Sequence, residues 1–112
     1  MNINNVIREA NEVAEKYNLQ VIEVDRTDDI ISLKLLVDTE LFIQIYGNDQ
    51  KEKLNLALVF KKRRLYGYDS EGGRYHCHPL DSPNEHIFID ERKSIQDFVE
   101  ESMKYLEEKE IL

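Results

Sequence analysis

The chain has 112 residues, 41% of them hydrophobic, and this length predicts a single domain, 1–112, with one core. Its 23 acidic and 15 basic residues give a formal net charge of -8, so the chain as a whole is not built to hold phosphates. The single cysteine, Cys77, excludes an internal disulfide, the stretch 1–17 is too polar for a signal peptide, and no apolar run reaches the ~20 residues of a membrane span. We therefore expect a cytoplasmic protein.

A helix is predicted at the start of the chain, because apolar residues recur there every three or four positions and so share one face. This stripe consists of Ile3, Val6, Ile7, Ala10, Val13, Ala14 and Tyr17. Asn18 follows it directly and is suited to the left-handed conformation that ends many helices. The pattern predicts that the helix ends at Tyr17.

Short, mostly alternating apolar segments come next, and polar turns separate them. The predicted strands cover 19–24, 30–37, 41–46, 54–60, 65–69, 74–78 and 86–89. Two of the turns, 47–50 and 70–73, contain the Gly, Asn, Asp and Ser residues that favour tight turns. Short strands joined by short turns predict an antiparallel meander.

A second helix is predicted near the end of the chain, where Ser94 and Asp97 have the spacing of a capping box. Its inward stripe consists of Ile95, Phe98, Val99, Ser102 and Leu106, and its outer face carries Glu100, Glu101, Glu107, Glu108 and Glu110. Together the segments predict an α+β fold. In it, an antiparallel β-meander of about five to seven strands is flanked by an N-terminal and a C-terminal helix, both packed on one face.

The three histidines of the chain are concentrated in one region. They lie in the run Arg74-Tyr75-His76-Cys77-His78-Pro79 and at His86. Because residues i and i+2 of a strand point to the same face, His76 and His78 are expected to be neighbours, with Cys77 on the opposite face. The proline-bounded loop 80–85 could bring His86 close to this pair, so the region is the strongest candidate for a functional site.

Three kinds of chemistry fit these histidines. They could bind a divalent transition metal, with Asp81 or Glu85 as an oxygen ligand. They could act as general acid and base without a metal, as in a metal-independent ribonuclease, with Arg74 stabilising charge at phosphorus. They could also simply bind phosphate together with Arg74. The competing interpretation is that the histidines are structural and paired with neighbouring groups, and that Cys77 is an inert thiol.

A basic segment precedes the histidines. It contains Lys51, Lys53, Lys61, Lys62, Arg63 and Arg64, with Glu52 as its only acidic residue. Lys61, Lys62, Arg63 and Arg64 could hold a nucleic-acid backbone while Tyr66, Tyr68 and Tyr75 stack on unpaired bases. The alternative is that the cations only solvate the strand ends and prevent edge pairing.

Three features follow one another in the stretch 31–86. They are a hairpin with an Asp-containing turn at 37–41, the run Tyr66-Gly67-Tyr68-Asp69, and a His- and Pro-rich stretch from His76 to His86, which precedes the last helix. By this pattern, about half of the chain resembles the TumE-like proteins, small toxin components of prokaryotic toxin–antitoxin pairs. The resemblance implies a growth-inhibiting protein that acts on RNA and is silenced by an antitoxin, with His76, His78 and His86 in the family's His-Pro segment.

The leading hypothesis is therefore a toxin-like protein acting on RNA, in which His76 and His78 perform acid–base or metal chemistry, assisted by His86 and Arg74. The alternative is a non-enzymatic protein–protein interaction domain, such as a homodimer, with structural histidines. Under the leading hypothesis, replacing His78 by Ala is expected to abolish activity and to change the free energy of unfolding by less than about 1 kcal/mol.

Overall fold

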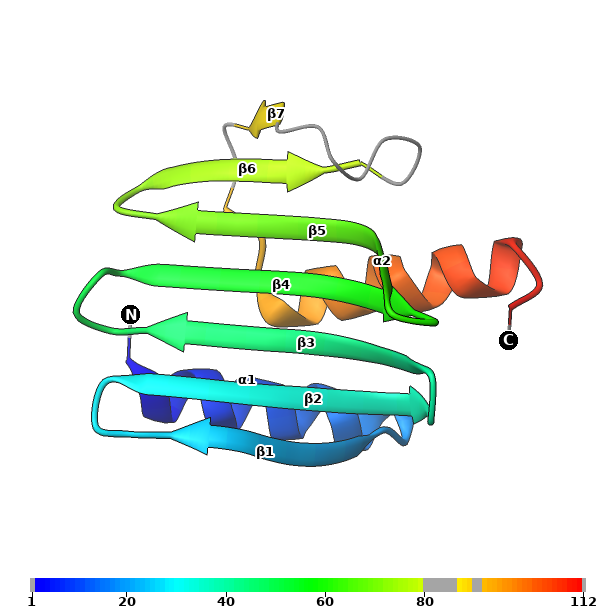
Figure 1. The fold of residues 1–112 in the computed structure, drawn as a ribbon, viewed down its shortest axis with the longest axis horizontal. Coiled ribbons are helices and arrows are strands. Elements are labelled where there is room, and N and C mark those ends of the chain that lie inside the picture. The colour runs from blue at the N-terminus through cyan, green and yellow to red at the C-terminus, as the bar shows by residue number, and fades with distance from the viewer. Residues whose placement is uncertain (1, 80–86, 90–91, 112) are drawn as a thin grey trace.

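The computed structural model describes residues 2–79, 87–89 and 92–111, and within them the chain forms two helices and seven strands (Figure 1). The helices are α1 (Ile3–Tyr17) and α2 (Ile95–Glu108). The strands are β1 (Gln20–Arg26), β2 (Ile30–Asp38), β3 (Leu41–Asn48), β4 (Lys53–Phe60), β5 (Arg63–Glu71), β6 (Arg74–His78) and β7 (Ile87–Ile89). The predicted α+β fold with an antiparallel sheet is confirmed.

The strands form one antiparallel sheet in which neighbours in sequence are neighbours in space, in the order β1-β2-β3-β4-β5-β6-β7. Turns of two to four residues join the first six strands. Such a meander needs only local pairing, which explains why alternation along the sequence was enough to predict it.

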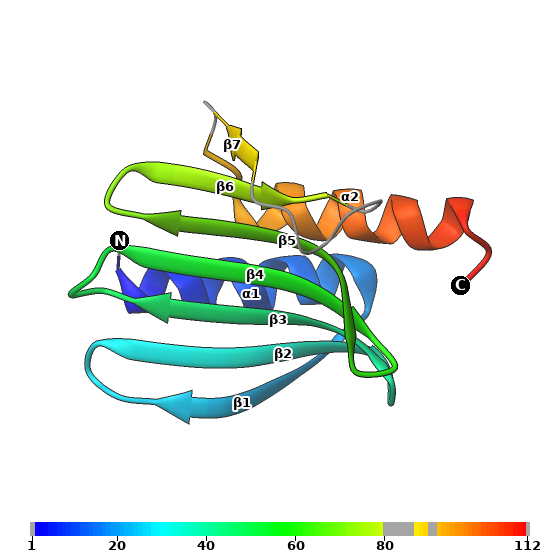
Figure 2. The ribbon, with the colours of Figure 1, turned by 45° about the horizontal axis from the view of Figure 1, so that its top comes forward.

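Both helices cover the same face of the sheet, as predicted, and the core lies between them and the strands (Figures 1 and 2). In β2, β3 and β4, alternate residues are buried on this side: Ile31, Leu33, Leu35, Leu41, Ile43, Ile45, Leu54, Leu56 and Leu58. The helices add Ile3, Val6, Ala10, Val13, Ala14, Ile95, Phe98, Val99 and Leu106. Full burial of one such aliphatic or aromatic side chain contributes about 1.5–3 kcal/mol, so this face holds the fold together. Neither helix covers the opposite face, which we call the helix-free face.

The helix ends have the capping residues that the sequence predicted. Asn18 ends α1 with φ 57, in the left-handed region. At the start of α2, the Asp97 N–H donates to Ser94 Oγ over 3.0 Å and the Ser94 N–H donates to Asp97 Oδ2 over 3.4 Å, which completes the capping box. In the part of the chain that the structure describes, no helix combines the length and apolar character needed to cross a membrane.

Candidate functional site

The helix-free face carries the histidine pair. Strand register places His78 in a row across the sheet with Gly67, Ala57, Gln44 and Lys34. The next row contains His76, Asp69, Asn55 and Tyr46. Because directly paired residues of neighbouring strands point to the same side, His76 and His78 share this face, as predicted.

His78 is buried and paired with a carboxylate. Its Nε2–H donates to Asp69 Oδ2 over 2.7 Å. The His78 side chain is 1% exposed, whereas that of Asp69 is 29% exposed. Leaving a buried polar group without a hydrogen bond lowers the free energy of unfolding by about 1–3 kcal/mol. The bond to Asp69 therefore stabilises an imidazole buried at this depth. Part of the Asp69 side chain is therefore accessible at the surface of the protein.

Gly67 makes room for the His78 ring. A Cβ atom at position 67 would lie 3.1 Å from His78 Cδ2, 3.2 Å from His78 Cβ and 3.3 Å from Arg64 Cδ. The ring therefore lies close to the backbone of β5, with the Arg64 side chain beside it. Arg74 lies opposite Glu71, four residues along β6 from His78. The structure thus brings Arg64 rather than Arg74 next to the histidine.

An open hollow of about 410 Å³ adjoins the Asp69–His78 pair. It is lined by Gln44, Tyr46, Lys53, Asn55, Leu56, Ala57, Arg64 and Asp69. With its amide nitrogen turned towards Asp69, Asn55 donates to Asp69 Oδ1 over 3.3 Å. Asp69 therefore connects the buried histidine to a hollow that offers a guanidinium, an ammonium and a phenol to a polar or anionic ligand.

The structure describes some, but not all, of the remaining residues of the predicted histidine site. His76 is half-buried and lies opposite Asp69 in β5. His86, Asp81 and Glu85 lie outside the described residues. Among the residues that the structure describes, no group of three or more His, Cys, Asp and Glu side chains could hold a metal ion. The metal site with His86 stays a prediction.

Tyr66 and Tyr68 lie in the core, on the helix-covered face. They are 6% and 0% exposed, and the Tyr66 ring stacks on Phe98 of α2 with a centroid distance of 4.9 Å and an interplanar angle of 3°. The prediction that these two rings stack on bases is therefore wrong. The spacing of Tyr66 and Tyr68 placed both rings on one face of the sheet, but it did not indicate whether the helices cover that face. Cys77 lies opposite Tyr68 on this same side, away from the histidines, as predicted.

The helix-free face has its own aromatic and basic residues. Phe42 and Tyr46 are half-buried there and line two hollows. The basic residues around these hollows are Lys34, Lys53, Lys61, Lys62 and Arg64, and the acidic ones are Glu40 and Asp69. The two helices on the other side carry eight acidic and three basic residues. Around these two hollows basic residues thus outnumber acidic ones, whereas acidic residues outnumber basic ones on the helices.

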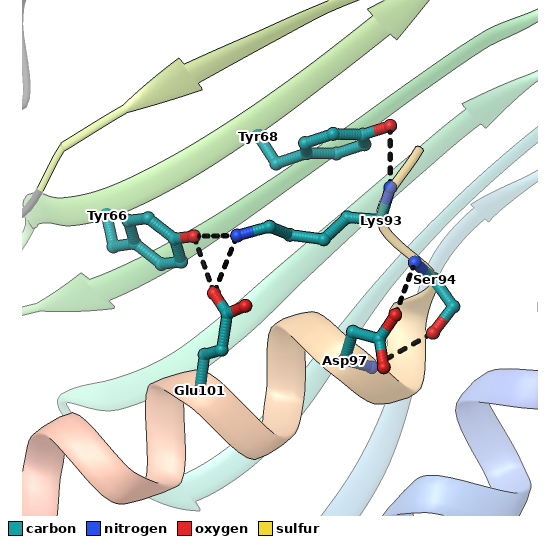
Figure 3. Close-up of polar contacts among 6 residues, drawn as sticks. All are labelled: Tyr66, Tyr68, Lys93, Ser94, Asp97 and Glu101. Atoms are coloured by element: carbon teal, nitrogen blue, oxygen red, sulfur yellow. Dashed lines mark hydrogen bonds and ion pairs between the residues drawn. The ribbon is translucent and has the colours of Figure 1, made fainter. Parts of the chain in front are cut away.

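A second polar cluster, which the sequence did not predict, ties α2 to the sheet (Figure 3). The Tyr66 hydroxyl donates to Glu101 Oε2 over 2.7 Å, and Lys93 Nζ donates to both the Tyr66 hydroxyl and Glu101 Oε2. The Lys93 N–H donates to the Tyr68 hydroxyl over 3.1 Å. Burial, followed by the hydrogen bond to the Glu101 carboxylate, raises the pKa of Tyr66, and burial raises the pKa of Tyr68.

The sequence held little signal for this cluster. Glu101 was assigned to the outer face of α2 with four other glutamates, and Lys93 precedes the N-cap outside the helical periodicity. Only the packing of α2 over β5 brings both residues to Tyr66. The cluster satisfies the polar ends of two buried tyrosines, so its role is to anchor the helix.

Comparisons with known proteins do not assign the chain to a family. A scan against protein-family models, a search of curated proteins and a search of solved structures each give no match for this chain. The function is therefore inferred from the chemistry and geometry of the helix-free face.

Proposed function

We propose that this protein acts on RNA, which it binds with the helix-free face of its sheet. The observation that carries the proposal is the separation of charge between the hollows of the sheet face, where basic residues predominate, and the acidic helices. Single-strand binders pair such a surface with aromatic rings, because cations hold the phosphates and the rings stack on the bases. Phe42 and Tyr46, which line the hollows of this face, would take the stacking role that the sequence gave to Tyr66 and Tyr68.

RNA is favoured over DNA on two grounds. The chain resembles the TumE-like toxins in its strand and histidine pattern, and that resemblance implies action on RNA. The partly exposed Asp69 carboxylate also offers an acceptor for a 2′-hydroxyl, the group that distinguishes RNA from DNA.

The chemistry that fits is metal-independent cleavage through the 2′-hydroxyl. Asp69 would take the 2′-hydroxyl proton as that oxygen attacks phosphorus, and His76 would protonate the departing 5′-oxygen, leaving a 2′,3′-cyclic phosphate. Arg64 would stabilise the charge that develops at phosphorus. His78 is 1% exposed, so its role in this scheme is to hold Asp69 in position through the 2.7 Å bond.

The test is an RNA-cleavage assay with purified protein, total cellular RNA and a chelator, beside His76→Ala and the control Lys104→Gln on α2. Cleavage that persists in chelator, yields cyclic phosphate ends and disappears only in His76→Ala is the expected result. Cleavage that requires an added divalent metal would instead make the histidines ligands. Failure of the wild-type protein to bind or cleave any RNA would overturn the proposal.

The resemblance extends the proposal to a toxin that an antitoxin silences. A partner that silences this surface would have to cover the basic helix-free face, so an acidic protein segment fits best. Production of the chain alone should then slow the growth of a bacterial host, and His76→Ala should restore it. Equal growth with both forms would argue against a toxin.

A second candidate function is a non-enzymatic protein–protein interaction domain with structural histidines. The burial of His78 and its bond to Asp69 favour this alternative, because that is how a structural histidine is satisfied. A protein that self-associates in sedimentation experiments and neither binds nor cleaves RNA would support it.

A further inference from the structure

A second hollow opens on the helix-free face, at the end of the sheet where two hairpin turns meet. Its volume is about 610 Å³, and it is lined by Lys34, Thr39, Glu40, Phe42, Lys61 and Lys62. Three of these six side chains are ammonium groups and one is an aromatic ring. This combination matches a ligand that has both a flat apolar part and an anionic part.

The two turns that form the hollow are joined to each other. Residues 39–40 link β2 to β3, and residues 61–62 link β4 to β5. The Lys61 N–H donates to the Glu40 carbonyl oxygen over 2.9 Å, and the Thr39 N–H donates to Asp38 Oδ1 over 2.6 Å. One backbone hydrogen bond therefore joins the two turns directly, and the Asp38 side chain fixes the backbone of the first turn.

The turn between β4 and β5 has an unusual sequence for its geometry. Phe60 pairs with Arg63, so the loop has only two residues, and both have positive φ: 50 for Lys61 and 67 for Lys62. Two-residue turns of this kind strongly favour Asn-Gly, because most side chains are strained at positive φ. Lys61 and Lys62 therefore place two ammonium groups at the rim of the hollow, in a turn that Asn-Gly would relax.

Phe42 forms the flat part of the hollow, and a lysine lies over it. Lys34 Nζ is 4.7 Å from the centroid of the Phe42 ring. Bases stack on aromatic side chains, so a base bound on this ring face would take the place of the ammonium. The Lys34 ammonium would then be available to the phosphate attached to that base. The Lys61 ammonium lies 5.2 Å from the centroid of the Phe60 ring, at the edge of the same turn.

We propose that this hollow binds one nucleotide unit of single-stranded RNA. The base stacks on Phe42, and the phosphate is held by Lys34 and Lys62, with Lys61 adding positive charge at the rim. The Thr39 hydroxyl and the Glu40 carboxylate are the groups available to the ribose hydroxyls. This inference rests on the proposed action on RNA. It adds a binding site for one nucleotide that is separate from the histidines.

The strained turn provides a sharp test, because relaxing it should separate stability from binding. The double variant Lys61→Asn/Lys62→Gly should unfold at a higher urea concentration than the wild type. It should also bind a fluorescein-labelled 12-nucleotide single-stranded RNA at least tenfold more weakly in fluorescence anisotropy. The matched control Lys16→Gln/Lys104→Gln removes two charges from the helices and should leave the affinity within twofold of the wild type.

Phe42 is tested with variants that keep the apolar volume. Phe42→Leu should weaken RNA binding about fivefold to tenfold, because it removes the ring face that stacks on the base. Phe42→Tyr retains the ring and should bind like the wild type. Equal affinity of the leucine variant, the turn variant and the wild type would overturn the nucleotide site while leaving RNA binding by the face intact.

A separate measurement distinguishes failure of the nucleotide site from failure of the proposed function. Adenosine 5′-monophosphate, titrated into the isotope-labelled chain, should shift the backbone NMR signals of Phe42, Lys61 and Lys62, whereas inorganic phosphate alone should shift only those of the lysines. If the wild-type protein binds no RNA but these shifts occur, the proposed function fails and the nucleotide site stands. No shift of these signals would overturn the site.

Discussion

At the scale of single residues, burial decides what each histidine can do. His76 is half-buried, whereas His78 is 1% exposed and its Nε2 lies 2.7 Å from Asp69 Oδ2. A side chain at the depth of His78 cannot meet a large substrate without the surrounding structure moving. In the proposed cleavage, His78 would therefore position Asp69, and proton transfer would fall to the groups nearer the surface.

This burial replaces the expectation that His78→Ala leaves stability within about 1 kcal/mol. We now expect His78→Ala to lower the free energy of unfolding by about 2–3 kcal/mol, because the variant leaves a cavity and removes a partner of Asp69. Urea denaturation followed by circular dichroism measures this value. His76→Ala is the matched control and should cost less than about 1 kcal/mol. Equal, small costs for both variants would contradict the role of His78 in packing.

Gly67 should be needed for space rather than for backbone conformation. Gly67→Ala should lower the free energy of unfolding by about 1–2 kcal/mol, because the new methyl group would lie 3.1 Å from His78 Cδ2. Urea denaturation of Gly67→Ala, alone and combined with His78→Ala, checks this. The glycine substitution should cost less once the ring is absent. A cost that is the same in both backgrounds would show that the His78 ring is not the group that excludes a side chain at position 67.

At the scale of elements, the cluster of Tyr66, Lys93 and Glu101 fixes α2 on the sheet. The phenol is the centre of the cluster, while the ring of Tyr66 packs separately on Phe98. Replacing Tyr66 by Phe therefore removes the polar anchor and keeps the packing. The ion pair between Lys93 and Glu101, with an N–O distance of 2.7 Å, remains possible in such a variant.

Tyr66→Phe should lower the free energy of unfolding by about 1 kcal/mol at pH 8, and this difference should shrink above pH 10. The folded state raises the pKa of Tyr66 above its ordinary value of 10.0, so the folded protein keeps the proton where the unfolded chain loses it. The stability from Tyr66 is therefore complete below pH 10 and declines as the pH rises towards the folded pKa. Urea denaturation of both proteins at pH 8 and pH 11 tests this. A difference that grows with pH would contradict the raised pKa.

The elements show how far the sequence alone could lead. Periodicity and turn residues predicted both helices, the meander and the two caps at Asn18 and Ser94, because each depends on residues close in sequence. The shared face of His76 and His78 followed from their spacing. The bond between His78 and Asp69 depends on the register of β5 and β6, and the burial of Tyr66 depends on where α2 packs. The register of β5 and β6 is set by their two-residue turn, whose exact bounds the turn residues 70–73 left open, and the position of α2 is not encoded in local spacing. Neither relation was therefore predicted.

At the scale of the whole molecule, acidic and basic residues are unevenly distributed, although the formal net charge is -8. The segment 53–64 contains five basic and no acidic residues, and four of the five line the hollows of the helix-free face. The helices, with eight acidic and three basic residues, lie on the other side. An RNA strand should therefore be attracted to one face and repelled by the other, which orients the protein before contact is made.

This polarity predicts how salt acts on RNA binding. Each phosphate contact to a single strand contributes about 0.7 to the slope of log affinity against log salt concentration. Removing two cations from the helix-free face, in Lys53→Gln/Arg64→Gln, should reduce the slope by about 1.4, because two contacts are lost. Removing two cations from the helices, in Lys16→Gln/Lys104→Gln, changes the net charge equally and should leave the slope unchanged. Fluorescence anisotropy with a labelled single-stranded RNA across a salt series measures both slopes. If the two variants changed the slope equally, RNA would be responding to net charge alone and the helix-free face would not be its binding surface.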